Sequence, residues 1–240
     1  MRNLLYFSRS VFFNFFLILW TMVWGITLLP LLFIKETRCL YKSAKLWAKG
    51  VCFLLAKICN IRIKVLGMEN IPLSSCIVAS KHQSALDIII LSLSIQNPVF
   101  IMKSSLLYLP IIGNFSKKTG MIAINRSGGA SSLKKMIKDV LSALSRGKSV
   151  IIFPEGTRTA PGAKTKYHNG ILAIYQAAKC PVLPVALNTG TCWKRNSFIK
   201  TPGVVTVKFL PVLSNIEKEL FMPKLQEQIE HESNLLLLKK

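Results

Sequence analysis

The sequence predicts an α/β fold attached to the membrane by its N-terminal segment. From Ile61 onward, short runs of β-branched residues alternate with helix-like stretches, as in a domain whose sheet is covered by helices. Ahead of this pattern lies an apolar run without a charged side chain. A length of 240 residues supports one sizeable core, so we expect one main domain with an attached segment.

The apolar run, residues 11–34, is the expected membrane anchor. It is long enough for the roughly twenty apolar residues that cross a hydrocarbon core. Charged residues follow it directly, where a cleaved signal peptide would carry small residues, so we expect the segment to remain attached. Gly25 and Pro30 could divide it into two shorter helices within one leaflet, so the spanning and re-entrant forms both stay open.

Basic residues are more numerous behind the apolar run than ahead of it. Arg2 and Arg9 precede it, and the residues that follow are Lys35, Arg38, Lys42, Lys45 and Lys49. Because loops rich in Lys and Arg stay on the cytoplasmic side, we expect the main domain in the cytoplasm. The six cysteines fall at irregular intervals without a C-x-x-C pair, which is typical of reduced thiols in that compartment.

Residues 40–58 combine apolar side chains and lysines at near-helical spacing. This pattern predicts either an amphipathic helix at the membrane interface or an ordinary helix packed on the main domain. Both interpretations bring Lys42, Lys45 and Lys49 close to the headgroups. We place the boundary near residue 60, with the anchor and this helix in residues 1–60 and the main domain in residues 61–240.

Seven runs in the main domain have the composition of strands. They are residues 61–65, 76–79, 99–102, 121–124, 150–153, 182–186 and 204–209. Helices are expected in the gaps between them. The best-marked helix covers residues 131–144, where apolar residues recur on one face opposite Lys134, Lys135 and Lys138.

Two side chains suited to proton transfer follow the second expected strand. They are His82 and Asp87, and the ends of strands are where α/β proteins place their sites. A five-residue offset turns through roughly 140° on an ideal helix, so the two side chains meet only if a turn lies between them. The carboxylate would then orient the imidazole as a general base. Alone, this spacing is a weak signal, because exposed pairs are usually solvated.

A second polar segment, residues 153–159, follows the strand-like run 150–152. It reads Phe-Pro-Glu-Gly-Thr-Arg-Thr and places Glu155 and Arg158 beside the turn residue Gly156. A buried strand rarely ends in charged residues unless they have a partner. This segment therefore strengthens the prediction that His82 and Asp87 belong to a functional site.

Together the two segments resemble the motifs of the glycerolipid acyltransferase family, specifically of the 1-acylglycerol-3-phosphate acyltransferases. The family pattern is His-x4-Asp followed downstream by Phe-Pro-Glu-Gly-Thr-Arg. Two further family blocks occur in the same order, at residues 120–126 and 182–186. The resemblance covers about residues 60–212. It implies a mixed α/β sheet flanked by helices, in an enzyme of phospholipid biosynthesis at the bacterial inner membrane that faces the cytoplasm.

The resemblance also implies a reaction. An acyl chain would pass from a thioester of coenzyme A or acyl carrier protein to the sn-2 hydroxyl of lysophosphatidic acid, giving phosphatidic acid. His82 would deprotonate the acceptor hydroxyl and Asp87 would fix the imidazole tautomer, without an acyl-enzyme. Arg126 and Arg158 would bind the phosphate, because the planar guanidinium binds phosphate through two hydrogen bonds.

Four further residues complete the substrate-binding set that the resemblance implies. Glu155 and Gly156 would shape the glycerol site, Thr157 belongs to the same block, and Lys103 would add a positive charge. No cofactor is expected beyond the acyl donor. No metal is expected, because no cluster of histidines and carboxylates has ligand spacing.

The chain departs from the family pattern at three places. Lys81 stands where the family commonly has Asn before its histidine, and Ser105 where a Glu often follows Lys103 by two residues. The Phe-Lys-x-Gly block is Tyr-His-Asn-Gly at residues 167–170. These departures bear on acceptor selectivity and on contacts to the donor. We leave His168 out of the catalytic set, because it has no carboxylate at a fixed spacing.

Charge and hydropathy leave two alternatives open. The formal charge of +22 should attract anionic partners, and a hydrophobic content of 51% favours a phospholipid membrane over nucleic acid. One alternative is a related acyltransferase that uses glycerol 3-phosphate or a lyso-aminolipid. The other is a non-enzymatic, membrane-tethered anion-binding protein. The sequence gives no preference for acyl donor, chain length or oligomeric state.

Overall fold

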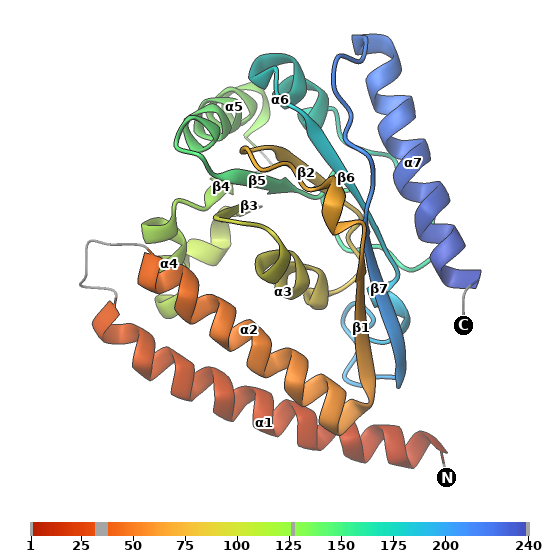
Figure 1. The fold of residues 1–240 in the computed structure, drawn as a ribbon. Helices are drawn as coiled ribbons and strands as arrows, with labels where there is room; N and C mark the ends of the chain where they lie inside the picture. Colours follow the sequence, from red (N-terminus) through yellow and green to blue (C-terminus); the bar gives the residue numbers. More distant parts are fainter. Residues whose placement is uncertain (1, 32–37, 126–127, 239–240) are drawn as a thin grey trace.

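The computed structural model describes residues 2–31, 38–125 and 128–238 (Figure 1). In these residues a single mixed sheet of seven strands carries helices on both faces, so the predicted α/β fold is confirmed. All seven strand-like runs form strands. These are β1 (Ile61–Leu66), β2 (Ile77–Ser80), β3 (Pro98–Lys103), β4 (Ile122–Ile124), β5 (Ser149–Ile152), β6 (Val182–Leu187) and β7 (Gly203–Phe209).

The strands follow the order β1-β7-β6-β2-β5-β3-β4 across the sheet. Neighbouring strands are parallel except β6 and β7, which pair antiparallel. The central strands β2, β5 and β6 are buried throughout. Burial on both faces explains their nearly continuous apolar sequences, which lack the alternation of a half-exposed strand.

Helices cover the two faces of the sheet separately (Figure 1). On one face lie α2 (Arg38–Cys59) and α3 (Ala85–Ser94), and on the other lie α5 (Gly129–Ser145), α6 (Gly170–Ala178) and α7 (Lys218–Leu238). The expected helix at residues 131–144 lies within α5 and is confirmed. Short elements complete the chain: η1 (Met68–Asn70), η2 (Ser104–Tyr108), α4 (Pro110–Thr119) and η3 (Thr189–Thr191).

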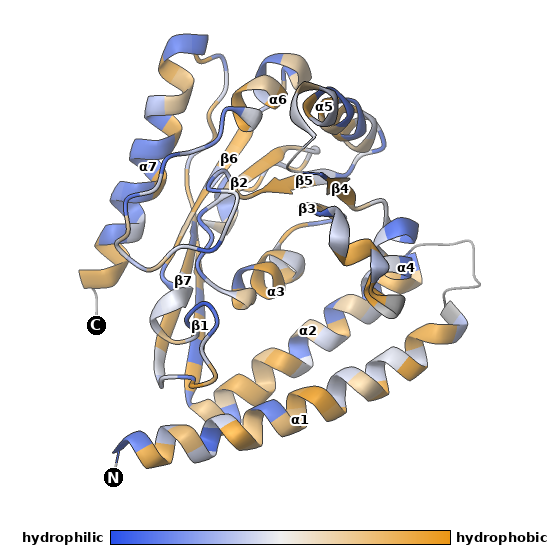
Figure 2. Cartoon of the chain, turned by 180° about the vertical axis from the view of Figure 1, so that it is seen from behind, coloured by the Kyte–Doolittle hydropathy of each residue, from blue (hydrophilic) through white to orange (hydrophobic). Residues whose placement is uncertain are grey.

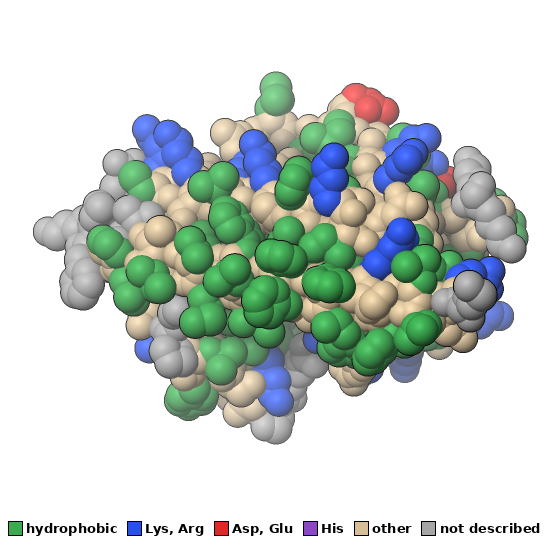
Figure 3. All heavy atoms as spheres, turned by 90° about the horizontal axis from the view of Figure 1, so that it is seen from below, with side chains coloured by type: hydrophobic (Ala, Val, Ile, Leu, Met, Phe, Trp, Pro, Cys, Tyr) green, Lys and Arg blue, Asp and Glu red, His purple; other side chains and the backbone are tan. Residues whose placement is uncertain are grey.

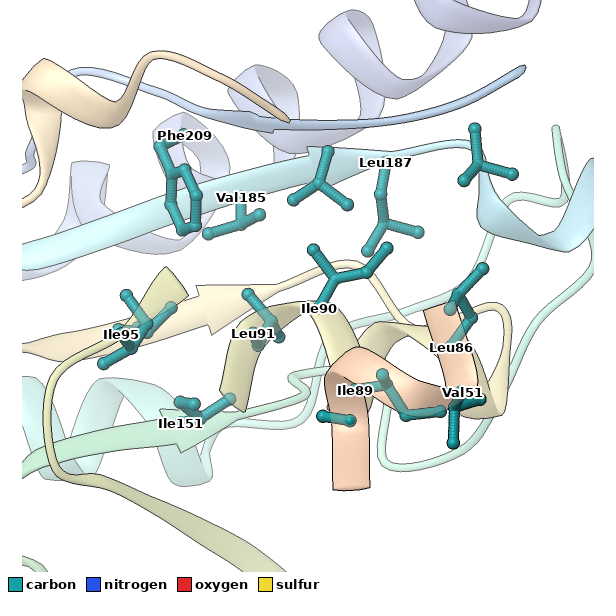
Figure 4. Close-up of a cluster of buried hydrophobic side chains, with 14 of the residues drawn as sticks. Val51, Leu86, Ile89, Ile90, Leu91, Ile95, Ile151, Val185, Leu187 and Phe209 are labelled. Atoms are coloured by element: carbon teal, nitrogen blue, oxygen red, sulfur yellow. The ribbon is translucent and has the colours of Figure 1, made fainter. Parts of the chain in front are cut away.

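The core beneath α3 joins helices and sheet in one cluster (Figure 4). Leu86, Ile89 and Ile90 of α3 pack between α2 and the strands. Their partners in Figure 4 include Val51, Ile151, Val185, Leu187 and Phe209. Burying a side chain of this size contributes about 1.5–3 kcal/mol, so this cluster fixes α3 and with it the turn that precedes α3.

The N-terminal segment forms a long helix, α1 (Arg2–Leu31), antiparallel to α2 (Figure 1). α1 is continuous through Gly25, and the last part of the expected anchor, residues 32–34, lies outside the described residues, as does Lys35. α2 lies between α1 and α3. Of the two interpretations of residues 40–58, the structure shows the helix packed on the domain. The boundary near residue 60 stays a prediction, although α2 ends at Cys59.

The outer face of α1 is apolar and uncovered (Figure 2). Figure 3 shows hydrophobic side chains gathered along this face, bordered by Lys and Arg. Exposed members from α1 include Phe7, Phe12, Phe15, Phe16, Ile18, Met22 and Ile26. Among the described helices, residues 2–30 alone are long and apolar enough to cross a membrane, judged by length and composition. A contiguous apolar face of this kind marks a surface that meets another apolar phase.

The buried Lys200 contacts the first half of α1 and holds it against the domain. The Lys200 ammonium donates to Asn14 Oδ1 of α1 and to the Phe198 carbonyl, both at 2.9 Å. It also lies 5.0–5.5 Å from three ring centroids, within range of cation–π attraction. The rings belong to Phe13, Trp193 and Phe198. Burial lowers the pKa of Lys200. Since α2 contacts α1 as well, α1 runs along the domain and does not stand free of it.

Candidate active site

Three neighbouring strands bring the polar segments together at one edge of the sheet. β6, β2 and β5 are adjacent and parallel, so their carboxyl ends lie side by side. His82 follows β2, Glu155 follows β5 and Thr189 follows β6. The two motif segments therefore share one site, although His82 and Glu155 are 73 residues apart in the chain.

A capped helix start explains how His82 and Asp87 meet. Ser84 is the N-cap of α3 with extended backbone angles, φ −144° and ψ 163°, and Asp87 is the third residue of the helix. Their side chains and backbone amides form a capping box, which fixes the turn between β2 and α3. In this turn His82 Nδ1 lies 2.9 Å from Asp87 Oδ2. The structure thus brings the pair together through the turn that the sequence required.

Asp87 is fully buried and its carboxylate accepts several further hydrogen bonds. The backbone amides of Gln83 and Ser84 donate to Oδ2 at 2.7 and 2.9 Å, and the Thr189 hydroxyl donates to Oδ1. Donors from two loops therefore hold the carboxylate against His82. Sequence reasoning missed Thr189, because its only local signal is its position after a strand.

The His82 imidazole is fixed on its other side by an aromatic ring. Phe153 stacks on it with ring centroids 3.8 Å apart and an interplanar angle of 17°. The His82 side chain is 12% exposed. With Nδ1 directed at Asp87, Nε2 is the nitrogen left to take a proton from a bound group. A ring held in one orientation with one free nitrogen suits a general base.

His82 lines a large apolar cavity. The cavity measures about 860 Å³, within the usual range for a binding pocket. Five helices contribute apolar side chains to its walls. From α1 and α2 come Trp24, Tyr41, Ala44 and Trp47. From α4, α5 and α6 come Phe115, Leu133, Met136 and Ile171. The few polar groups include Lys45, Lys103, Arg158 and His168. The cavity therefore combines a wide apolar volume with cations and one oriented base.

Most of the expected substrate-binding residues line this cavity. Lys103, Gly156, Thr157 and Arg158 do so together with His82. Arg126 lies outside the described residues, and its role stays a prediction. His168, which we left out of the catalytic set, also lines the cavity. The structure therefore adds His168 to the residues within reach of a bound molecule.

Gly156 is required by its surroundings as well as by its backbone. Its φ of +69° lies in the left-handed region that favours glycine. A Cβ at this position would come within 2.9 Å of the His168 ring, closer than real contacts allow. Any side chain here would push His168 out of place, so the glycine keeps the cavity wall compact.

Glu155 is buried beneath the cavity wall. It is 2% exposed, it is absent from the cavity lining, and its carboxylate accepts from the His82 backbone amide at 2.7 Å and from Thr159 Oγ1 at 2.9 Å. Its counter-charge is Lys81, with Nζ 2.6 Å from Oε1. Burial raises the pKa of the Glu155 carboxyl, and the Lys81 ammonium opposes this shift. Glu155 thus supports the His82 loop through these contacts, and its expected part in the glycerol site stays a prediction.

The described side chains define the chemistry available at this site. His82 can accept a proton, and Lys103 and Arg158 can bind an anion, all around one apolar volume. No group of three or more histidines, cysteines or carboxylates in the described part of the chain is arranged to hold a metal ion. The arrangement suits proton abstraction from a hydroxyl of an amphiphilic, anionic molecule.

Comparison with known proteins agrees with this chemistry. The family model described as Acyltransferase matches residues 62–188. The 1-acyl-sn-glycerol-3-phosphate acyltransferase of Pseudomonas aeruginosa is 34% identical over 206 residues, which cover 85% of this chain and 80% of that protein. The enzyme of the same name from Borreliella burgdorferi is 30% identical over 178 residues, 71% of each chain.

A solved structure shares the whole fold. The crystal structure of the 1-acyl-sn-glycerophosphate acyltransferase of Thermotoga maritima superposes with a TM-score of 0.79 and covers 98% of both chains. The sequence identity is 23%, so this likeness concerns the fold. Because the match includes the N-terminal helices, the attachment of α1 and α2 to the sheet is part of the shared architecture.

Proposed function

This chain belongs to the acyltransferase family, and from that premise we propose that it transfers an acyl chain from a thioester to the sn-2 hydroxyl of lysophosphatidic acid, giving phosphatidic acid. The observation that carries the proposal is the His82–Asp87 pair at the wall of an apolar cavity with cationic side chains. The names of the relatives support this acceptor. The proposed reaction is a step of phospholipid biosynthesis.

The proposed step needs one base and no covalent enzyme intermediate. His82 Nε2 removes the proton of the acceptor hydroxyl while the oxygen attacks the thioester carbonyl. The carbon–sulfur bond breaks, the new ester carbon–oxygen bond remains, and the leaving thiolate takes the proton from the imidazolium. Asp87 keeps the ring in the tautomer with its proton on Nδ1 and stabilises the imidazolium as it forms.

The acceptor phosphate is proposed to bind beside the base. Arg158 and Lys103 line the same cavity as His82, and Arg126 would join them. The fatty tails would fill the apolar volume between α2, α4 and α5. The donor is proposed to be acyl-CoA or acyl carrier protein, because the charge of +22 attracts the phosphates of either one.

The membrane is proposed to meet the apolar face of α1. Lys200 and α2 hold α1 along the domain, which supports a helix lying in one leaflet over one that crosses the bilayer. The lysines of α2 would then contact anionic headgroups. We propose the bacterial inner membrane with the site on its cytoplasmic side, because the net charge of +22 suits the anionic cytoplasmic leaflet.

An acceptor comparison tests the proposed function. Purified protein is incubated with labelled palmitoyl-CoA or palmitoyl carrier protein and with lysophosphatidate, glycerol 3-phosphate or a lyso-aminolipid. We expect lysophosphatidate to be acylated with a kcat/KM at least about tenfold above the other acceptors, because only it offers both the phosphate and the tail. Preferential acylation of the phosphate-free acceptor would contradict the proposal, and so would the absence of transfer to any acceptor.

Filling the cavity is expected to change the chain-length preference. Ala44 of α2 lines the cavity, so Ala44→Phe places a ring in the volume that a tail would occupy. We expect the ratio of kcat/KM for octanoyl over palmitoyl donors to rise roughly tenfold. Leu46→Phe is the control, since Leu46 is on the same helix, 60% exposed and outside the cavity lining. An equal loss with both donors would place the tails elsewhere.

A further inference from the structure

The residue before the base, Lys81, is almost completely buried. Its backbone amide donates to the Val185 carbonyl at 3.0 Å, which continues the pairing of β2 with β6 beyond Ser80. Its side chain is 1% exposed and reaches α7, the C-terminal helix. A buried lysine without a partner costs several kcal/mol, so its contacts decide whether this arrangement is stable.

Two carboxylates contact the Lys81 ammonium, and a phenol donates to one of them. Nζ lies 2.6 Å from Glu155 Oε1 and 2.7 and 2.9 Å from the two oxygens of Glu230. The Tyr167 hydroxyl donates to Glu230 Oε1 at 2.9 Å. Burial and the two nearby carboxylates raise the pKa of Tyr167, so its hydroxyl remains a donor. One positive charge thus lies between two carboxylates, and the neutral Tyr167 hydroxyl donates to one of them.

This group is connected directly to the catalytic turn. Glu155 Oε2 accepts from the backbone amide of His82 at 2.7 Å. Thr159 closes the connection, since its amide donates to the His82 carbonyl at 2.8 Å and its hydroxyl to Glu155 Oε1 at 2.9 Å. The path Glu230–Lys81–Glu155–His82 therefore runs from α7 to the base through hydrogen bonds and ion pairs of 2.6–2.9 Å.

We propose that Lys81 and Glu230 are positioning residues for acyl transfer: their buried ion pair holds Glu155 in place, and Glu155 holds the backbone of His82. The inference rests on the proposed function and deepens it, because it makes α7 a support of the active site. Neither side chain lines the cavity, so both act through another residue.

The charges of these three side chains predict that the double variant is more active than Lys81→Gln alone. In Lys81→Gln, the buried carboxylate of Glu155 faces the partly buried carboxylate of Glu230 without their cation, and their repulsion displaces Glu155. In Glu230→Gln, the Lys81–Glu155 pair survives and loses only one partner. In the double variant, a single carboxylate remains beside two neutral amides. The second substitution should therefore recover part of what the first one loses.

The test measures kcat and KM for lysophosphatidate acylation. We expect Lys81→Gln to lower kcat by roughly 10–100-fold with KM within about twofold of wild type, because small displacements of a catalytic group act on the reaction step. Glu230→Gln should lose less, and Lys81→Gln with Glu230→Gln should exceed Lys81→Gln alone. The matched controls are Lys208→Gln and Glu232→Gln, an ion pair of 2.7 Å that also joins the sheet to α7 but does not lead to His82.

A spectroscopic measurement makes the inference independent of the acyl assay. The ring signals of His82 are recorded by NMR on protein labelled at histidine nitrogen and are assigned by their loss in His82→Ala. We expect them to shift in Lys81→Gln and Glu230→Gln and to stay unchanged in Glu232→Gln. If Lys81→Gln does not fold, the comparison of Glu230→Gln with Glu232→Gln carries the test.

The outcomes separate the two proposals. Shifted His82 signals in a protein that acylates no acceptor would refute the proposed function and leave the positioning role intact. Wild-type kcat and unshifted His82 signals in folded Glu230→Gln would overturn the positioning role, whatever the acceptor. A double variant no better than Lys81→Gln would also overturn it, because charge repulsion would then not be the cause.

Discussion

Replacing His82 with alanine is expected to lower kcat for acyl transfer by about 10²–10⁴-fold. The imidazole is the only described base at the cavity wall that a buried carboxylate orients, and its loss removes the group that takes the hydroxyl proton. Binding should change little, because the cations and the apolar walls stay in place. The measurement is steady-state turnover with lysophosphatidate and an acyl thioester.

Two histidine variants serve as controls for this prediction. His168 lines the same cavity, but among the described residues no carboxylate hydrogen-bonds to its ring. His231 is exposed on α7. We expect His231→Ala to keep wild-type turnover and His168→Ala to affect KM more than kcat. A loss of kcat in His168→Ala as large as that in His82→Ala would move the base to His168 and refute the assignment.

Replacing Asp87 with asparagine is expected to lower kcat by roughly 10²–10⁴-fold and also to destabilise the fold. An amide no longer selects the His82 tautomer with a proton on Nδ1, and it stabilises an imidazolium poorly. The same carboxylate accepts from the amides of Gln83 and Ser84 and from Thr189, so a buried donor loses its partner. We expect a loss of about 1–3 kcal/mol in the free energy of unfolding.

Both effects of Asp87→Asn are measurable on the same sample. Turnover gives the catalytic effect, and denaturant unfolding in detergent gives the free energy. Asp139→Asn is the control, since Asp139 is half-buried on α5 and pairs with Lys135 one helical turn away. That variant should change stability by less than about 0.5 kcal/mol and turnover not at all. If Asp87→Asn lost stability but kept turnover, Asp87 would be a helix cap and no partner of the base.

The sequence predicted the central strands β2, β5 and β6 because strands buried on both faces are apolar over their whole length. The outer strands β1 and β7, which are partly exposed, were predictable from their β-branched residues. It did not predict that β6 and β7 pair antiparallel, since pairing direction depends on where the chain crosses over. The contact of His82 with Asp87 was predictable from local sequence, because a turn between two residues five positions apart can bring their side chains together. The contact of Thr189 was not predictable, because Thr189 lies 102 residues from Asp87 and follows β6, a strand that no local pattern places beside β2.

The side-chain direction of Glu155 could not be predicted from the sequence. A motif gives the residue type at a site but not the direction of the side chain. The carboxylate turns away from the cavity because Lys81 and the amide of His82 lie on its other side, and both are there only once β2 and β5 are neighbours. The departure from the family pattern at Lys81 was visible in the sequence, whereas its partner on α7 was not.

Thr21 and Trp24 of α1 belong to the lining of the substrate cavity, although α1 also carries the apolar outer face of the protein. A fragment without α1 would therefore lack part of the wall of this cavity. The helix whose outer face we propose to meet the lipid thus also forms part of the cavity in which we propose the lysolipid to react.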